Sequence, residues 1–175
     1  MDDRLHINNI ILFLEEAISF VVMYNNLSWD PPVSISQLAP TTASLFQPNT
    51  GLAISHHCME EMVYRHQPEW FEGFEIVIYI QNYLRALMDI TPSESFHTRF
   101  YFVAFTCHLC VLAIKLGRSE IIRHILVDAV IILYSECNSH RDFVNLNEAA
   151  LDYLSRHRAR HEESEDDGFN TAPED

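Results

Sequence analysis

Histidine and cysteine, the residue types of this sequence that could bind a metal ion, fall close together in two places. Residues 56–58 read His-His-Cys, and residues 107–110 read Cys-His-Leu-Cys. Thiolate and imidazole are the ligands that zinc prefers, and residues three apart share one face of a helix. Zinc knuckles lie on loops, however, whereas residues 107–110 fall inside an apolar run where cysteine packs as a small hydrophobe. We therefore expect no bound metal and no cofactor.

Motifs of catalysis are the next signal to consider. The sequence contains no Gly-x-Ser-x-Gly turn and no glycine-rich phosphate loop. Most of the ten histidines fall on polar faces of expected helices, where solvated surface is the ordinary explanation. Carboxylates such as Glu60 and Glu61 are adjacent in sequence, so they diverge on a helix. The sequence therefore indicates that the chain is not an enzyme.

Charge excludes further classes of partner. The formal net charge is −14, and the eleven basic residues are one lysine and ten arginines without a continuous basic stripe. Such a surface repels a phosphate backbone and, for the same reason, an anionic lipid surface. We expect no nucleic-acid partner.

The cysteines and the N-terminus bear on the compartment. All four cysteines sit in apolar helical patterns, and Asp2 and Asp3 stand where a signal peptide would be basic. Reduced thiols in an intracellular, cytoplasmic protein are the natural interpretation. The longest apolar run, residues 100–114, covers about 15 positions, fewer than the roughly 20 that cross a bilayer. We expect no transmembrane anchor.

Hydrophobic periodicity predicts one all-α domain over residues 1–160. Scarce glycine and proline leave long segments uninterrupted, and apolar residues recur at three- and four-residue spacing. The expected helices cover residues 7–24, about 50–67, 70–89 with a break at Gly73, 92–116, 119–137 and 143–160, and the complete chain should form seven or eight helices without a sheet.

One of these helices should lie at the centre. Thr91-Pro92-Ser93-Glu94 resembles a capping box with proline at the first helical position. The segment that follows is apolar on every side up to Gly117, so other helices must surround it. Residues 102–114 are expected to be the most buried part of the chain.

Two segments lack helical periodicity. Residues 30–51 carry four prolines among serine and threonine, which predicts a long loop. Residues 161–175 contain seven acidic side chains, which predicts a disordered tail.

Four stretches together resemble the Bcl-2 family of apoptosis regulators. Residues 20–30, FVVMYNNLSWD, resemble the end of the family's first helix, and residues 60–70, EEMVYRHQPEW, the close of its second. Residues 102–111, FVAFTCHLCV, are similar to the central helix, and residues 143–153 have the spacing of the second homology motif. The resemblance spans residues 7–153 and implies a Bcl-2-like bundle, in which amphipathic helices surround one apolar helix.

The family's homology motifs are altered in this chain. The first, Asn-Trp-Gly-Arg, corresponds to residues 96–99, Phe-His-Thr-Arg, so its arginine is either Arg99 or replaced by Thr98. The second has Phe143 and Glu148-Ala149-Ala150 in place of its Trp and Gly-Gly pattern, and in the third His56 and His57 replace Gly-Asp. This drift is typical of a viral homologue acting on a host.

The resemblance implies a pro-survival, anti-apoptotic regulator that sequesters the death-motif (BH3) helix of pro-apoptotic relatives in a hydrophobic groove. Such a protein could reach the mitochondrial outer membrane through its partners. A pro-apoptotic effector of the same fold, and a helical adaptor or homodimer with an unused groove, stay open as alternatives. The groove residues that the resemblance implies are Met62, His66, Trp70, Leu84, Leu87, Phe102 and, as counter-ion of the ligand's aspartate, Arg99.

Overall fold

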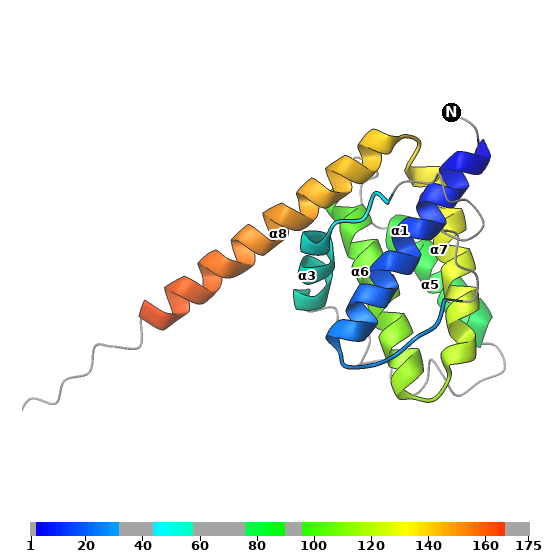
Figure 1. Cartoon of the computed structure of the whole chain (residues 1–175), viewed down its shortest axis with the longest axis horizontal. Coiled ribbons are helices and arrows are strands. Elements are labelled where there is room, and N and C mark those ends of the chain that lie inside the picture. The colour runs from blue at the N-terminus through cyan, green and yellow to red at the C-terminus, as the bar shows by residue number, and fades with distance from the viewer. Residues whose placement is uncertain (1–2, 32–43, 58–75, 90–95, 167–175) are drawn as a thin grey trace, which may run out of the picture.

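The structure, a computed structural model, describes residues 3–31, 44–57, 76–89 and 96–166, and all regular structure in these ranges is helical (Figure 1). This confirms the all-α expectation, while the helix count of the complete chain stays a prediction. The expected cap at residues 91–94 and the break at Gly73 lie outside the described residues. The elements are α1 (Asp3–Tyr24), α3 (Pro48–His56), α5 (Ile76–Asp89), α6 (Phe96–Lys115), the short 3₁₀ helix η1 (Ser119–Ile121), α7 (Ile122–Glu136) and α8 (His140–Asp166).

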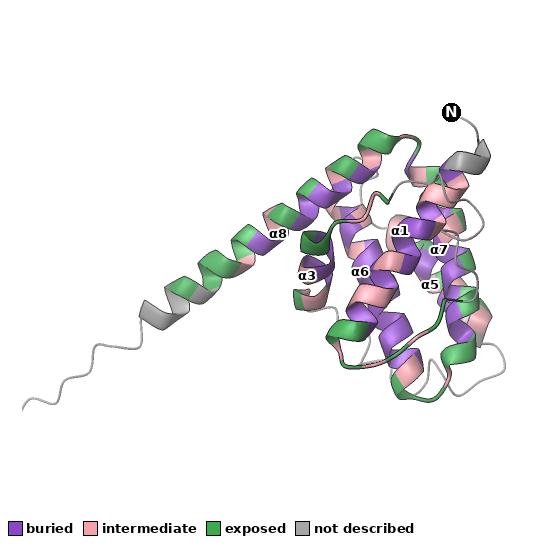
Figure 2. Cartoon of the chain, in the orientation of Figure 1, coloured by how far each residue is buried: buried purple, intermediate pink, exposed green. Residues whose placement is uncertain are grey.

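Helix α6 is the centre of the bundle. It packs against α1, α3, α5, α7 and α8, and every residue from 102 to 113 is buried (Figure 2). This is the longest uninterrupted buried run in the described ranges. A helix without a polar face has no side to turn to water, so its neighbours must cover all of it. The expected central helix is confirmed, although Ile114 at its end is only half-buried.

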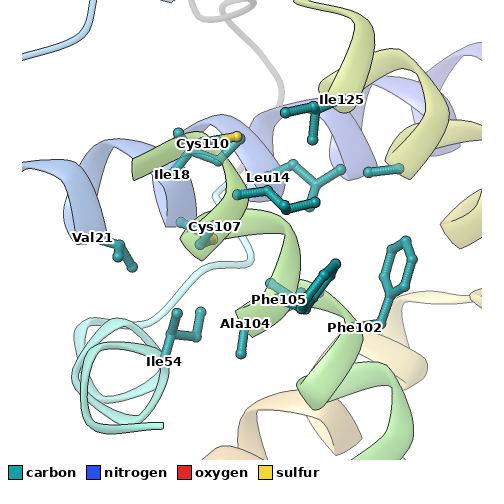
Figure 3. Close-up of a cluster of buried hydrophobic side chains, with 14 of the residues drawn as sticks. Leu14, Ile18, Val21, Ile54, Phe102, Ala104, Phe105, Cys107, Cys110 and Ile125 are labelled. Atoms are coloured by element: carbon teal, nitrogen blue, oxygen red, sulfur yellow. The ribbon is translucent and has the colours of Figure 1, made fainter. Parts of the chain in front are cut away.

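The packing around α6 combines helices from both ends of the sequence. Leu14, Ile18 and Val21 of α1 lie against the Cys107 and Cys110 side of α6 (Figure 3). All five side chains are completely buried. Burial of each large aliphatic side chain contributes about 1.5–3 kcal/mol to folding, so this interface is a main source of stability.

Left-handed residues end the first and the central helix. Gly117 has φ 70°, and the Arg118 N–H donates to the Ala113 carbonyl at 2.8 Å, as in a Schellman motif. Asn26 has φ 57°, and the Leu27 N–H donates to the Val22 carbonyl at 3.0 Å in the same way. The expected end of the first helix at residue 24 and of the central helix before Gly117 are therefore confirmed.

Helix α3 begins earlier than expected. Pro48 occupies its first turn, where proline needs no hydrogen bond, so residues 48–51 are helical and do not belong to the expected loop 30–51. Thr50 donates a 2.5 Å hydrogen bond to Asn147 of α8, and Asn147 donates to the Leu45 carbonyl at 2.9 Å. These bonds fix the start of α3 against α8.

Helix α8 is longer at both ends than the predicted 143–160. Asp142 accepts hydrogen bonds from the backbone N–H groups of Asn138 and Ser139, both at 2.8 Å, which caps the helix at its start. At the other end the helix continues to Asp166, so the expectation of a disordered tail from residue 161 is wrong for residues 161–166. Arginine, alanine and glutamate favour helix, and no glycine intervenes before Gly168.

Candidate functional site

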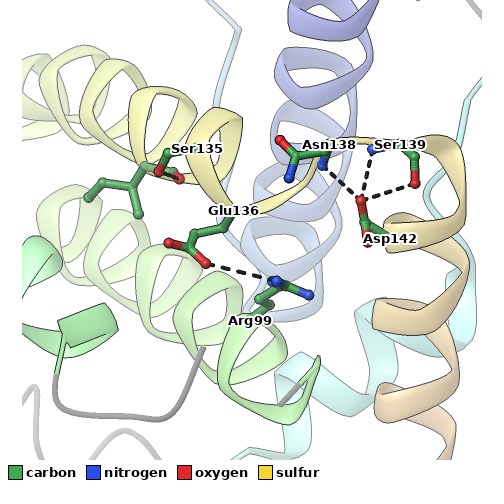
Figure 4. A network of polar contacts seen from close by, with 7 residues as sticks. Arg99, Ser135, Glu136, Asn138, Ser139 and Asp142 are labelled. Atoms are coloured by element: carbon green, nitrogen blue, oxygen red, sulfur yellow. Dashed lines mark hydrogen bonds and ion pairs between the residues drawn. The ribbon is translucent and has the colours of Figure 1, made fainter. Parts of the chain in front are cut away.

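Arg99, the expected counter-ion of a ligand, lies in the first turn of α6 and is held inside the fold. Its Nη2 is 3.8 Å from Oε2 of Glu136, at the end of α7, and its Cζ lies 4.4 Å from the centre of the Phe96 ring (Figure 4). Only 11% of the Arg99 side chain is exposed. A counter-ion for a ligand would have to be open to solvent, whereas Arg99 is mostly buried, and the carboxylate of Glu136 offsets the cost of burying its charge.

The other expected groove residues do not form one open surface in the described part of the chain. Leu84 and Phe102 have no exposed surface and belong to the core, whereas Leu87 is half-buried against it. Residues that fill a core cannot contact a ligand unless the helices separate. The remaining expected contacts, Met62, His66 and Trp70, lie outside the described residues.

The direction of Arg99 follows from the helical geometry of α6. Residues two apart on a helix point about 200° apart, so Tyr101 lies almost opposite Arg99. The Tyr101 ring is 4.7 Å from that of His57, at the end of α3. Thr98 shares its face with Phe105, seven positions on, and the Phe105 ring is 5.3 Å from that of Tyr83 on α5. Thr98 and Tyr101, rather than Arg99, therefore lie on the sides of α6 that meet α5 and α3.

Helix α5 has two different flanks. Gln81 donates a hydrogen bond to Asp128 of α7. Burial raises the pKa of the Asp128 carboxyl group, and the nearby positive charge of Arg85 opposes this rise. Tyr83 comes two positions after Gln81, and Leu87 comes two positions after Arg85. Each therefore points about 200° round the helix from its counterpart. Both are half-buried. The apolar flank of α5 is thus turned away from α7.

An aromatic cluster joins α3, α6 and α8. The ring of His57 lies 5.8 Å from Phe100, 4.7 Å from Tyr101 and 5.3 Å from Tyr153, while Phe100 and Tyr153 are 5.5 Å apart. Tyr153 also donates a 3.0 Å hydrogen bond to the His56 carbonyl. Sequence reasoning missed this cluster, because its members come from three helices and only their packing brings them together.

His57 is the most perturbed histidine of this cluster. Its Nδ1 is buried and has no hydrogen-bond partner in the structure. Burial in the aromatic surroundings, helped by His108 nearby, lowers the pKa of His57 from 6.5 to about 4. The imidazole is therefore neutral at physiological pH and packs as an aromatic ring, not as a charge.

Polar and basic groups line a small cavity beside the cluster. Asp152 of α8 accepts hydrogen bonds from His97 and Arg156, both at 2.8 Å, and the bond from His97 is the main reason that its pKa is lowered. The cavity measures about 110 Å³ and lies between the start of α6 and the middle of α8. Its lining residues are His97, Tyr101, Asp152, Tyr153, Arg156, His157 and Arg160.

A larger hollow lies at the opposite end of α6. It measures about 700 Å³ and is lined by the segment after α1, including Trp29, and by the start of α7. Trp29 is half-buried against the core, and Arg123, His124 and Glu120 line the other side. This mixed lining of both charges indicates no particular ligand.

The candidate zinc ligands are dispersed. Burial raises the pKa of Cys107 well above its usual range and also that of Cys110, while the pKa of Cys137 rises to about 12. Thiols in such surroundings stay protonated and unreactive. Within the described residues, no three histidine, cysteine or acidic side chains converge on a point where a metal ion could bind. Cys58 lies outside these residues, and the absence of zinc stays a prediction.

Two helices have the length and composition of a membrane span, residues His6–Tyr24 of α1 and Phe96–Lys115 of α6. The argument that the apolar run is too short for a bilayer is therefore wrong, because α6 contains 20 residues. In the most apolar 18-residue stretch of each helix, 78% is buried in α6 and 50% in α1. The burial of α6 is typical of a core helix, which can have the same length and composition as a membrane span.

Comparison with known proteins gives no match: no family model, no curated protein and no solved structure is similar to this chain.

The pKa of His57 makes stability depend on pH. As pH falls from about 6.5 to about 4, the unfolded chain binds a proton at residue 57 that the folded chain does not, so the free energy of unfolding falls. His57→Phe should therefore gain stability relative to the wild type across this interval. Urea titrations of both proteins at several pH values measure the difference. If the free energy of unfolding of His57→Phe changes with pH in the same way as that of the wild type, His57 does not have the buried environment described above.

The position of Arg99 predicts a structural role. Arg99→Ala should lower the free energy of unfolding by about 1–3 kcal/mol, because a nearly buried ion pair and its packing on Phe96 are lost. Arg118→Ala removes a matched but exposed pair with Glu120 and should cost less than about 1 kcal/mol. Denaturant unfolding of both variants provides the comparison, and equal losses would argue against the buried position of Arg99.

Proposed function

We propose that this chain is a pro-survival regulator of the Bcl-2 type, which binds the amphipathic death-motif helix of pro-apoptotic partners in an apolar groove. The proposal rests on the sequence resemblance together with one structural observation: α3 and α5 approach α6 from different sides. Helix α3 packs against α6, α1 and α8, whereas α5 packs against α6 and α7. A central apolar helix flanked by two separate helices is an arrangement in which a ligand helix can lie between the walls.

The described side chains that we assign to the proposed groove are apolar or aromatic. Tyr83 and Leu87 occupy the flank of α5 that is turned away from α7, and Tyr101 lies beside His57 at the end of α3. Leucine and aromatic side chains are the usual anchors of a groove that receives the apolar face of a helix. We therefore assign the ligand's apolar contacts to this part of the chain.

Arg99 is not part of the proposed groove. It is engaged with Glu136 on the α7 side of α6, whereas Thr98 and Phe105 face α5. Of the two alignments that the sequence leaves open, the one with Thr98 in the family's arginine position fits this geometry better. The proposed groove is accordingly anchored by apolar contacts, without an arginine from this motif.

The two membrane-length helices favour a pro-apoptotic effector as a second candidate. Such a protein would have to withdraw α6 from the core in order to insert it, and most of that helix is buried. Release of a dye from liposomes by the pure protein would favour the effector, and peptide binding without release would favour the regulator. The pro-survival role places the chain inside the cell, at the mitochondrial outer membrane through its partners, whereas an effector would insert its own helix.

Fluorescence-anisotropy titration of death-motif peptides tests the proposal. The wild type should bind at least one such peptide, and Leu87→Glu should weaken binding at least about tenfold, which corresponds to about 1.4 kcal/mol. Val127→Glu is the control, because Val127 is 52% exposed on α7 and away from the proposed groove; it should bind as the wild type does. Circular dichroism verifies that both variants are folded. A wild type that binds none of the peptides would refute the proposal.

A further inference from the structure

The small cavity between the start of α6 and the middle of α8 is lined by one face of α8. Tyr153, Arg156, His157 and Arg160 follow each other at three- and four-residue spacing, so they point to the same side of the helix. Arg158 lies two positions from each of these arginines, so it points about 200° away from both. It is not among the described residues that line the cavity. Arg156 and Arg160 therefore converge on one space, and Arg158 does not.

Asp152 holds the first of these arginines in place. Its Oδ2 accepts hydrogen bonds from Nη2 of Arg156 and from Nε2 of His97, both at 2.8 Å. A guanidinium group carries several N–H donors on three nitrogens, and this contact engages only one nitrogen of Arg156. The remaining donors of Arg156 stay available to a ligand.

Arg160 provides the charge of the cavity that no carboxylate offsets. Within the described ranges of the chain, no ion pair or hydrogen bond involves Arg160. Beyond Leu154, α8 leaves the body of the protein, so both arginines are open to solvent (Figure 1). With histidine neutral, the two arginines and the one aspartate of the lining leave an excess of positive charge. In a chain of net charge −14, this is a local place where an anion is attracted.

The size of the cavity limits the ligand to one small group. Its volume of about 110 Å³ is well below the roughly 300–1,000 Å³ of sites that enclose a whole small molecule. The planar fork of a guanidinium matches the oxygens of phosphate and of carboxylate. Phosphate has more oxygens and, as a dianion, more charge than a carboxylate, so it gains more from two arginines that converge on it. A phosphate group therefore fits this lining best.

We propose that the cavity between α6 and α8 is a binding site for a phosphate group, in which Arg156 and Arg160 donate hydrogen bonds to its oxygens and Asp152 holds Arg156 in position. The same chemistry serves free phosphate and a phosphorylated side chain of a partner protein. Neither arginine is a contact that the proposed function uses, so this site does not depend on that function. Because both arginines are exposed, binding is weak and sensitive to salt.

Nuclear magnetic resonance titration of the full chain with inorganic phosphate, at constant ionic strength, tests the site. The Nε–Hε signals of Arg156 and Arg160 should shift and saturate with a dissociation constant on the order of 1 mM. Acetate should bind at least about threefold more weakly, because it has fewer oxygens and less charge. O-phosphoserine and O-phosphotyrosine separate the two sources of phosphate: tighter binding of either than of inorganic phosphate assigns the site to a phosphorylated side chain, and weaker binding assigns it to the free ion.

Arg160→Gln and Arg158→Gln form a matched pair of variants, because each removes one positive charge from the same exposed stretch of α8. Arg160→Gln should raise the dissociation constant for phosphate at least about fivefold, whereas Arg158→Gln should change it less than about twofold. Circular dichroism verifies that both variants are folded.

Three results would overturn the proposal. The first is the absence of saturable shifts in the wild type up to about 20 mM phosphate, far above the expected dissociation constant. The second is an equal loss of binding in the two variants, because the effect would then be one of overall charge and not of this cavity. The third is binding of acetate as tight as that of phosphate, because the site would then take carboxylates.

Discussion

The burial of α6 on every side is the constraint on which the rest of the structure depends. An apolar helix with twelve consecutive buried positions, residues 102–113, must be enclosed by neighbours, and five other α-helices in the described ranges pack against it. Each neighbour turns one apolar face toward α6, so the surfaces left for function are the flanks and free ends of these outer helices. The apolar flank of α5, the aromatic cluster around His57 and residues 155–160 of α8 are three such surfaces.

The parts of the fold that depend on local sequence could be predicted, and those that depend on contacts between helices could not. The central helix and its end at Gly117 follow from an apolar run closed by a left-handed residue. The direction in which Arg99 points could not be predicted from local sequence, because its partner Glu136 lies on another helix. The same holds for His57, whose low pKa arises from rings on α6 and α8. The end of α8 differs from the prediction for another reason: a run of acidic residues indicates disorder, although glutamate is a good helix former.

Charge is distributed so that the proposed groove lies apart from the basic surface of α8. The proposed groove between α3 and α5 is apolar and aromatic, and Arg99 is withdrawn from it by its contact with Glu136. Basic residues are concentrated instead at residues 156–160 of α8 and at the cavity beside them.

Native-state hydrogen exchange measures most directly whether α6 is the fixed centre of the fold. If it is, the amides of residues 102–113 exchange only when the whole chain unfolds, and their free energy of opening equals the global free energy of unfolding within about 1 kcal/mol. The amides of residues 155–160, in the exposed part of α8, should open at much lower energy. Exchange of α6 through a partial opening well below the global value would contradict the account, because the central helix would then leave the core without unfolding the protein.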